Sequence, residues 1–481
     1  MKVQVNTQKT RGSYIAPTHW MNSTLRYVPP MNFPAFLKKR LGKPEIMRVW
    51  ITLDEYYDYR TDTKYPDFEI GTMRYPVEQL HYPYDMRLIV PAPSGTRFKD
   101  YLTSHSKHAK YLLLNVRRYE REVSDGIITY DQYEKLFSDA VEYCKDLAPN
   151  IRYIECCNEV DIANFGLLNA DEYVKIYLRA HHAITRLNEK HQYEIPLEIG
   201  GFGMAHPLEN FQLMRGVMQQ LKSSPLGGDA MAFYSYHMYN NPADRSMING
   251  GHPERTGLSG VEKLSKILDQ HRQMVSGLGL ADRPVFVNEL GRARATGIDG
   301  DSLYNAAGVI SYLIAFSEGA FGQAYPFPWC SFHNPNLQMS YTQYIQKDGT
   351  FLATPNGIAM EMLHSMQGRR MECCVSEMDY RDSRYCAIAV KNKEEYAVLC
   401  TNPTTESLPC FIELEGVENG KYQVQIYRCD IQENNCVFKN GKGDGTLRCS
   451  MEKEVNAKGG VLKIMELYDK NCFSLLRFRK I

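Results

Sequence analysis

The chain has 481 residues, with 56 Lys and Arg against 56 Asp and Glu, so its formal net charge is zero. This length exceeds one ordinary compact domain and predicts a large domain joined to a smaller one. The lack of a basic excess argues against a nucleic-acid partner and against an anionic membrane surface. No stretch of the sequence is apolar for long enough to cross a bilayer, so we expect no membrane partner.

The 13 cysteines include no Cys-x-x-Cys pair, and the adjacent pairs at 156–157 and 373–374 lack the spacing of a zinc site. We expect mostly reduced, buried thiols, with a few disulfides as the alternative. Residues 1–5 have none of the apolar character of a secretory signal. Two locations stay open: the cytoplasm, or an extracytoplasmic compartment if a leader has been removed.

Short apolar runs alternate with longer segments of helical spacing over residues 12–365, a pattern typical of βαβ units around a parallel sheet. Eight runs are predicted to be strands: 13–16, 46–51, 111–116, 151–156, 197–201, 231–236, 284–288 and 322–325. The predicted helices include 130–147, 171–188, 258–274, 302–316 and 356–366, and Asn169 with Glu172 is predicted to form a capping box. This pattern predicts an α/β fold, a (β/α)8 TIM barrel. The alternative, a doubly wound open sheet, lacks its Gly-rich phosphate loop after the first run.

The pattern changes after residue 370 to short alternating runs separated by turn residues, which predicts a C-terminal antiparallel β-sandwich. We expect residues 1–10 to form a strand that joins this sandwich. The expected division is therefore 1–10 with the sandwich at 369–481, and the barrel at 11–368.

Two glutamates follow predicted strands of the barrel, where active sites of this fold lie. Glu159 follows the fourth strand and Glu289 ends the seventh, so both are expected to point into the same mouth from opposite sides. Retaining glycosidases need two carboxylates about 5–5.5 Å apart around the scissile bond. The pair therefore predicts a retaining glycosidase.

The three tryptophans, Trp20, Trp50 and Trp329, fall near predicted strands one, two and eight, which are neighbours in a closed barrel. We expect them at the carboxyl ends of these strands, where they would form an apolar platform for a sugar ring. The alternative is three unrelated core residues. His19, beside Trp20, is expected either in the cleft or in the core.

The motifs around the two glutamates resemble clan A glycoside hydrolases. These motifs are Asn158 before Glu159, the segment Tyr236-His237-Met238-Tyr239 after the sixth strand, and Arg48 on the second. The resemblance implies that Glu159 is the acid/base, Glu289 the nucleophile, and Asn158 a ligand of the substrate 2-hydroxyl. It also implies that Tyr239 holds the nucleophile, His237 lines the cleft, and Arg48 lies near the nucleophile.

The two-domain layout and residues 354–370 are most similar to family 39, which contains β-xylosidases and α-L-iduronidases. Val160 stands where the clan often has Pro, and Trp50 stands in place of the family's His-Gly. Residues 331–334 lack the family's acidic residue after Trp329. These departures leave the catalytic pair intact and concern the sugar that is bound.

Other polar residues near the strand ends have weaker predictions. We expect Asp161 and Asn164 to contact substrate, with loop capping as the alternative. For Arg292 and Arg294 we favour pairing with loop acids over binding an anionic sugar. Arg117 and Arg118 are predicted to form a structural ion pair with Glu120.

The sequence as a whole predicts a β-xylosidase-like enzyme that cleaves a plant-type oligosaccharide or polysaccharide by double displacement, without metal or cofactor. One alternative is a barrel that binds glycans without cutting them; another is a clan A glycosidase acting on a glucoside, galactoside, arabinoside or uronide. A Schiff-base barrel enzyme ranks last, because no lysine lies near a predicted strand end. The oligomeric state stays open.

Overall fold

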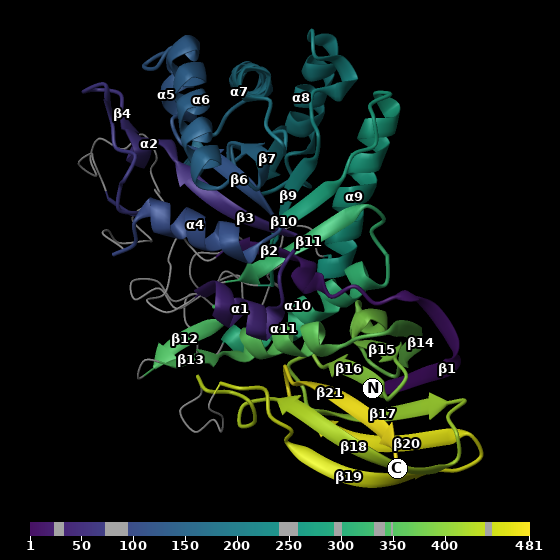
Figure 1. Ribbon diagram of the computed structural model, residues 1–481. Helices are drawn as coiled ribbons and strands as arrows, with labels where there is room; N and C mark the ends of the chain where they lie inside the picture. Colours follow the sequence, from purple (N-terminus) through teal and green to yellow (C-terminus); the bar gives the residue numbers. More distant parts are fainter. Residues whose placement is uncertain are drawn as a thin grey trace.

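The computed structural model describes residues 1–23, 33–72, 95–239, 258–292, 301–330, 342–347, 350–437 and 445–481. It contains a closed parallel barrel surrounded by helices and a nine-stranded sheet packed against one side of that barrel (Figure 1). No helix of the described residues is both long and apolar enough to cross a membrane.

The barrel consists of eight strands in chain order, each parallel to the next, and the last closes on the first. They are β2 (Trp20–Ser23), β3 (Ile46–Thr52), β6 (Tyr111–Arg117), β7 (Ile151–Cys156), β8 (Glu198–Met204), β9 (Tyr234–Tyr239), β10 (Val285–Gly291) and β11 (Ala324–Cys330). The predicted (β/α)8 barrel is therefore confirmed.

The position of the first strand was predicted wrongly. The segment at 13–16 is not a barrel strand, because Ser13 ends β1 and Pro17 begins the short helix η1 (Pro17–His19). The strand lies at Trp20–Ser23 instead, where it pairs with β3 and β11. Its sequence has no β-branched residue, so its strand conformation depends on these tertiary pairings.

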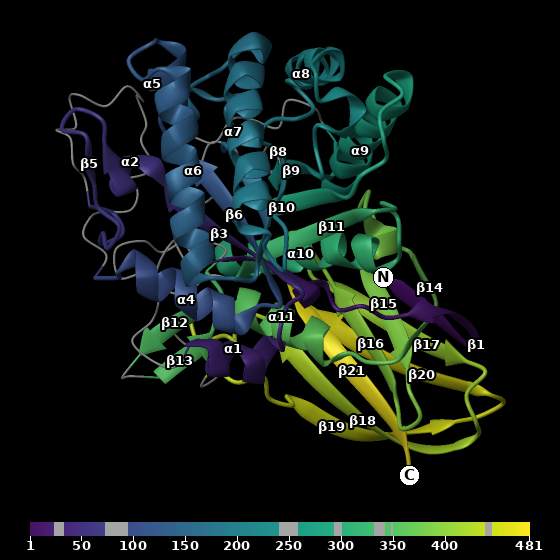
Figure 2. The ribbon, with the colours of Figure 1, turned by 45° about the horizontal axis from the view of Figure 1, so that its top comes forward.

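Helices cover the outside of the barrel, and Figure 2 shows α4, α6, α7, α8 and α9 around it. The helices are α1 (Phe33–Leu41), α2 (Leu53–Tyr56), α4 (Phe98–His108), α5 (Glu120–Ser124), α6 (Tyr130–Leu147), α7 (Ala170–His191), α8 (Phe211–Ser223), α9 (Gly260–Gly277), α10 (Asp301–Ser317) and α11 (Pro355–Ser365). Asn169 and Glu172 form the predicted capping box of α7. Short helices are η3 (Ala163–Phe165), η4 (Gly227–Asp229) and η6 (Ser383–Tyr385), and two small hairpins pair β4 (Tyr57–Asp58) with β5 (Thr63–Lys64) and β12 (Tyr344–Lys347) with β13 (Thr350–Ala353).

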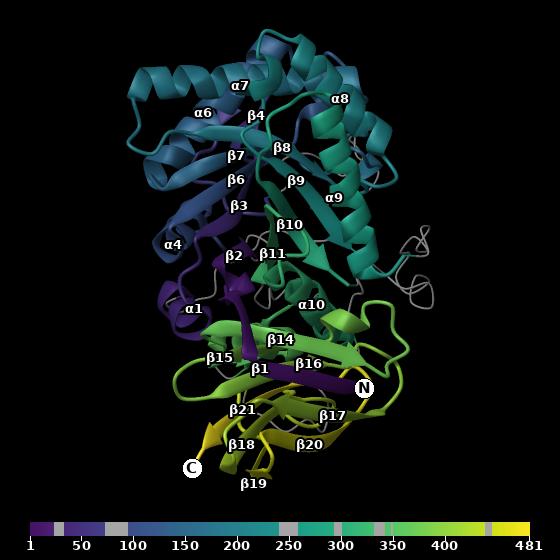
Figure 3. The same ribbon diagram turned by 90° about the vertical axis from the view of Figure 1, so that its right-hand side faces the viewer.

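The nine-stranded sheet contains the N-terminal strand and the C-terminal part of the chain, and both termini lie in it (Figure 3). In spatial order it runs β19 (Met451–Ala457), β18 (Gly420–Cys429), β21 (Phe473–Lys480), β16 (Tyr396–Thr401), β15 (Ala387–Lys391), β14 (Arg369–Ser376), β1 (Lys2–Ser13), β17 (Leu408–Glu415) and β20 (Val461–Tyr468). The C-terminal β-rich domain is thus confirmed, but its strands form one mixed sheet instead of two facing sheets. The reason is β1, which pairs antiparallel with β14 and parallel with β17 and so joins the two halves.

Alternate residues of this sheet belong to two different cores. Ala387 and Ala389 pack inside the β-rich domain, whereas Ile388 and Val390 between them pack with the core of the barrel. Thr401 also donates to the carbonyl of Ala307 in α10 at 2.9 Å. β1 continues in this sheet to Ser13, beyond the expected boundary at residue 10, so we propose a division into residues 1–13 with 369–481 and residues 14–368.

Candidate active site

The barrel interior has three layers from the amino ends of its strands to their carboxyl ends. The first layer is apolar and contains Ile46, Leu113, Phe233, Phe286 and Phe327. The second is polar and buried, with Arg48, Asn115, Glu155, Ser235 and Asn288. The third, at the carboxyl ends, contains Trp50, Glu159, His237, Tyr239, Glu289 and Trp329. Strands β3, β6, β9 and β11 supply residues two apart, because alternate side chains point inward, whereas a register shift in β10 brings the consecutive residues Asn288 and Glu289 into the barrel.

The two predicted glutamates meet in the third layer. Glu159 lies beyond the end of β7 at a positive φ of 49°, and its N–H donates to the carbonyl of Gly203 at 2.7 Å. Glu289 lies in β10, at a register shift between Val287 and Glu289. The two carboxylates and His237 each offer an atom within 4.8 Å of the others. This proximity matches the about 5–5.5 Å between the carboxyl groups of retaining glycosidases and not the wider inverting arrangement.

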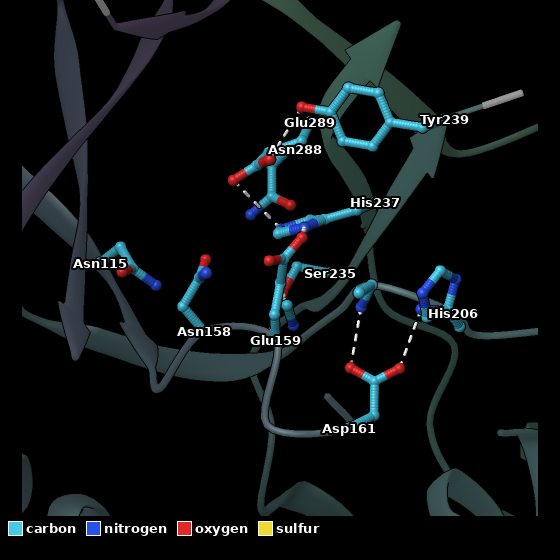
Figure 4. Close-up of polar contacts among 12 residues, drawn as sticks. Asn115, Asn158, Glu159, Asp161, His206, Ser235, His237, Tyr239, Asn288 and Glu289 are labelled. Carbon is cyan, nitrogen blue, oxygen red and sulfur yellow. Dashed lines mark hydrogen bonds and ion pairs between the residues drawn. The ribbon is translucent and has the colours of Figure 1, made fainter. Parts of the chain in front are cut away.

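His237 lies between the two carboxylates (Figure 4). Its Nδ1 is 2.7 Å from Glu159 Oε1, and its Nε2 is 3.6 Å from Glu289 Oε1. Burial lowers the pKa of this imidazole, but the charge of Glu289 and the hydrogen bond and charge of Glu159 outweigh burial and raise it. His237 is therefore biased towards its protonated form and links the two carboxylates.

Glu289 is held from two sides. Arg48 donates to Oε1 at 2.9 Å, and the hydroxyl of Tyr239 donates to Oε2 at 2.9 Å. Trp329 Nε1 in turn donates to the Tyr239 hydroxyl at 2.9 Å. Arg48 also donates to Asn158 Oδ1 at 2.8 Å, so one guanidinium orients residues on both sides of the site.

Glu155 is a buried polar residue that the sequence analysis did not single out. Its carboxylate accepts from Arg48 Nε at 2.8 Å, Asn115 Nδ2 at 2.8 Å, Ser235 Oγ at 2.5 Å and Asn288 Nδ2 at 2.5 Å. Burial raises the pKa of this carboxyl, but Arg48, His237 and the hydrogen bonds outweigh it and lower the pKa. Polar residues at inward positions of strands that are otherwise apolar are the sequence signal that would have identified it.

Two of the three tryptophans lie at the expected carboxyl ends of barrel strands, and their role as a sugar platform stays a prediction. Trp50 and Trp329 stack with ring centroids 6.1 Å apart at the carboxyl ends of β3 and β11. Trp20 lies at the opposite end of the barrel, where it pairs with Ile46 and packs 4.9 Å from the ring of Tyr325. His19 is exposed at that same end, so both were predicted at the wrong end. The cause is the shifted first strand, which makes Trp20 its first residue.

Asp161 caps a loop through hydrogen bonds, which was the alternative to the expected substrate contact. Its two oxygens accept from the N–H groups of Ala205 and His206 at 2.9 and 2.8 Å, as Figure 4 shows, and from Asn210 Nδ2 at 3.0 Å. These contacts fix the connection between β8 and α8. The side chain of Asn164 lies outside the described part of the structure.

The arginines near the strand ends have different partners from those predicted. Arg292 donates to the carbonyls of Tyr304 and Pro403 at 3.3 and 2.9 Å, which ties the barrel to the β-rich domain. Glu120 accepts from the backbone N–H of Arg118 at 2.9 Å and does not pair with Arg117. Arg294 and residues 331–334 lie outside the described residues.

Glu159, His237 and Glu289 also have the donor types and proximity of a metal site. Two of these groups already have protein partners, since His237 Nδ1 shares a hydrogen bond with Glu159 and Arg48 donates to Glu289. All 13 cysteines are free thiols.

Comparisons with protein-family models and with curated proteins found no match. Comparison with solved structures found similar folds, all at low sequence identity. A GH39 enzyme from Xanthomonas axonopodis pv. citri has a TM-score of 0.64 at 14% identity, covering 100% of this chain and 97% of that one. A monomeric beta-xylosidase from Caulobacter crescentus CB15 has a TM-score of 0.62 at 13% identity, covering 100% and 99%. A bacterial orthologue of human α-L-iduronidase has a TM-score of 0.63 at 12% identity, covering 100% and 84%. The chain therefore has the fold of these enzymes along its whole length.

Proposed function

We propose that this protein is a retaining glycoside hydrolase that acts by double displacement. The observation that carries the proposal is the proximity of Glu159 and Glu289, whose oxygens approach within 4.8 Å in a buried, polar mouth. A glycan-binding barrel without activity needs no such pair, so this proximity favours the enzyme.

Glu289 is the nucleophile in this proposal. Donors from Arg48 and Tyr239 bind its two oxygens, which orients the carboxylate and favours its charged form for attack on the anomeric carbon. The bond to the leaving oxygen breaks as the glycosyl–enzyme ester forms.

Glu159 is the acid/base. It gives its proton to the leaving oxygen in the first step and takes a proton from water in the second, when water cleaves the ester. His237, hydrogen bonded to Glu159 and close to Glu289, orients the two carboxylates relative to each other.

The proposed substrate is an oligosaccharide or polysaccharide of plant type, with β-xylosidase-like action as the first hypothesis. The GH39 and beta-xylosidase structures of the same fold support this choice. Asn158 accepts from Arg48 through Oδ1, so its NH₂ group is the donor that would bind the sugar 2-hydroxyl. The stacked Trp50 and Trp329 form the apolar wall of the site.

The test uses aryl xylosides, galactosides, glucosides and arabinosides with the wild type and two variants. Glu289→Ala should abolish turnover, and Glu159→Ala should abolish it on substrates with a poor leaving group and recover with azide. Glu198→Ala is the control, because Glu198 pairs with Arg152 at the other end of the barrel. NMR of the first-formed sugar should show retained anomeric configuration. Full activity in either catalytic variant, or inversion, would overturn the proposal.

A further inference from the structure

Arg117 is the last residue of β6, and its side chain belongs to the mouth of the barrel. Leu113 of the same strand lies in the apolar layer, and Asn115 donates to Glu155 in the polar layer. Arg117 is two residues further towards the carboxyl end, on the same inward face. Its guanidinium lies 4.4 Å from the ring centroid of Trp50 and 5.8 Å from that of Phe165.

This guanidinium is buried, and within the described part of the chain no anion lies at ion-pair distance from it. Arg117 is only 7% exposed, and its Nε has no hydrogen-bond partner. No carboxylate of the described residues forms an ion pair or a hydrogen bond with it. Arg48, by contrast, pairs with two carboxylates, and Arg292 donates to two carbonyls. Buried charges are normally paired, so this cation is an exception that needs an explanation.

Neighbouring charges also affect the pKa of Arg117. Burial and, after it, the positive charges of Arg118 and Arg48 lower the pKa of Arg117 to about 10, although the charges of Glu289 and Asp54 act in the opposite direction. The side chain therefore still carries its charge at neutral pH. A buried guanidinium whose Nε lacks a hydrogen-bond partner is a group that can bind a carboxylate or a sulfate.

Arg117 is connected to the reacting centre through aromatic contacts. Trp50, on which it stacks, also stacks on Trp329, and Trp329 donates through Tyr239 to the nucleophile Glu289. The charge of Glu289 acts on Arg117 directly. The ring of Trp50 is already covered by the guanidiniums of Arg48 and Arg117, so a sugar bound beside Glu289 would lie next to Arg117 itself.

We propose that Arg117 binds an anionic group of the substrate, so that the enzyme acts on an acidic glycan that carries a carboxylate or a sulfate. This inference rests on the proposed glycosidase function and narrows its substrate class. A uronate has the ring of xylose with a carboxylate added at C5, so the pocket of a xyloside-like enzyme is compatible with it. A neutral sugar would cover the guanidinium and leave it unpaired, which we expect to cost about 100-fold in kcat/KM relative to an acidic sugar.

The binding test does not depend on catalysis. Sodium D-glucuronate, galactose 6-sulfate and D-xylose are titrated into the full-length wild type and into Arg117→Met, with calorimetry and melting temperature as readouts. The wild type should bind at least one acidic sugar, and Arg117→Met should lose that binding while its affinity for xylose is equal or higher. Without ligand, Arg117→Met should melt no lower than the wild type, because the variant removes an unpaired buried charge.

Two further variants keep the result interpretable. Arg152→Met is the control. Arg152 also lies against aromatic rings, those of two tyrosines, but it is at the amino end of the barrel and pairs with Glu198. Arg117→Lys keeps the charge without the fork and should weaken acidic-sugar binding about tenfold, which also serves if Arg117→Met does not fold.

The outcomes distinguish a substrate carboxylate from a substrate sulfate. Binding of glucuronate alone identifies a uronate, binding of galactose 6-sulfate alone identifies a sulfate ester, and binding of both means that the shared negative charge is recognised. Equal binding of the acidic sugars by wild type and Arg117→Met, or binding of xylose only, would overturn the inference. Arg117-dependent binding by a protein that hydrolyses no aryl glycoside, acidic or neutral, would overturn the proposed function and leave this site standing.

Discussion

Arg48 and Glu155 form an ion pair that no solvent reaches. The Nε of Arg48 lies 2.8 Å from Glu155 Oε2, and both side chains have 0% exposure. The same guanidinium donates to Glu289, the proposed nucleophile, and to Asn158. The charge of Arg48 is thus itself oriented by a carboxylate of the same buried layer, which lies below Glu159 and Glu289.

Replacing Glu155 by Gln should reduce both stability and turnover. The neutral amide would remove one of the two carboxylates that pair with Arg48. Its NH₂ group would also face the NH₂ groups of Asn115 and Asn288, which now donate to the carboxylate. Breaking one partner of a buried pair typically costs about 3–5 kcal/mol of unfolding free energy. We expect kcat to fall about 100-fold, because Arg48 would no longer be held against Glu289.

Glu198→Gln is the control for this prediction. Glu198 pairs with Arg152 at 2.8 Å, with both side chains more than a third exposed. That variant should lose at most about 1 kcal/mol and keep its kcat. If Glu155→Gln lost stability but kept full kcat, Glu155 would be structural and would not position the site.

The raised pKa of His237 predicts a pH-dependent contribution to stability. A histidine with a folded pKa above the ordinary value of 6.5 stabilises the fold below that value, and this stabilisation is lost as pH rises through the raised pKa. The difference in unfolding free energy between wild type and His237→Gln should therefore shrink as pH rises from about 6 to about 9. Denaturant titrations at a series of pH values measure it.

His182→Gln gives the matched control, because His182 is exposed and pairs with Glu134 on the surface. Its difference from the wild type should stay small across the same pH range. A difference for His237→Gln that was constant or grew with pH would contradict the prediction.

Asp161→Asn separates a loop-capping role from a substrate contact. Asn retains one acceptor oxygen and cannot receive both N–H groups of Ala205 and His206, so we expect a loss of about 1–3 kcal/mol in stability. KM should remain unchanged, whereas a residue that binds substrate would raise KM. Asp171→Asn, on the exposed first turn of α7, should change stability by no more than about 0.5 kcal/mol.

Trp329→Phe tests the hydrogen bonds that connect Trp329 through Tyr239 to Glu289. Phe keeps the stacking surface against Trp50 but removes the Nε1 donor to Tyr239. Loss of one such hydrogen bond should reduce kcat/KM about tenfold. Trp20→Phe should leave kcat/KM unchanged, because Trp20 lies at the amino end of the barrel. Equal losses in both variants would mean that the effect is on folding and not on the site.

Local sequence patterns predicted the architecture and the two glutamates that the barrel brings together. Strand 151–156 was predicted to its last residue, and the capping box of α7 was predicted from Asn169 and Glu172. Both depend on contacts within a few residues along the chain. Glu159 and Glu289 could be identified because they follow apolar strands, and the fold places the ends of such strands together.

The errors arose where the sequence signal was weak or the partners were distant. Strand β2 lacks β-branched residues, so the first strand was misplaced, and Trp20 and His19 with it. Asp161 could not be separated from a substrate ligand, since its partners lie more than 40 residues away. Glu155 was overlooked because its four donors come from four other strands.

The sequence by itself determined the periodicity of the elements, the order of barrel and β-rich domain, and the two glutamates at the strand ends. These features are encoded in residues close together along the chain. The tertiary structure alone decided which groups face one another across the barrel. Strand register and closure set the pairing of Arg48 with Glu155 and Glu289, the insertion of β1 between β14 and β17, and the buried, unpaired charge of Arg117. Such relationships join residues more than 60 positions apart, and no local propensity specifies them.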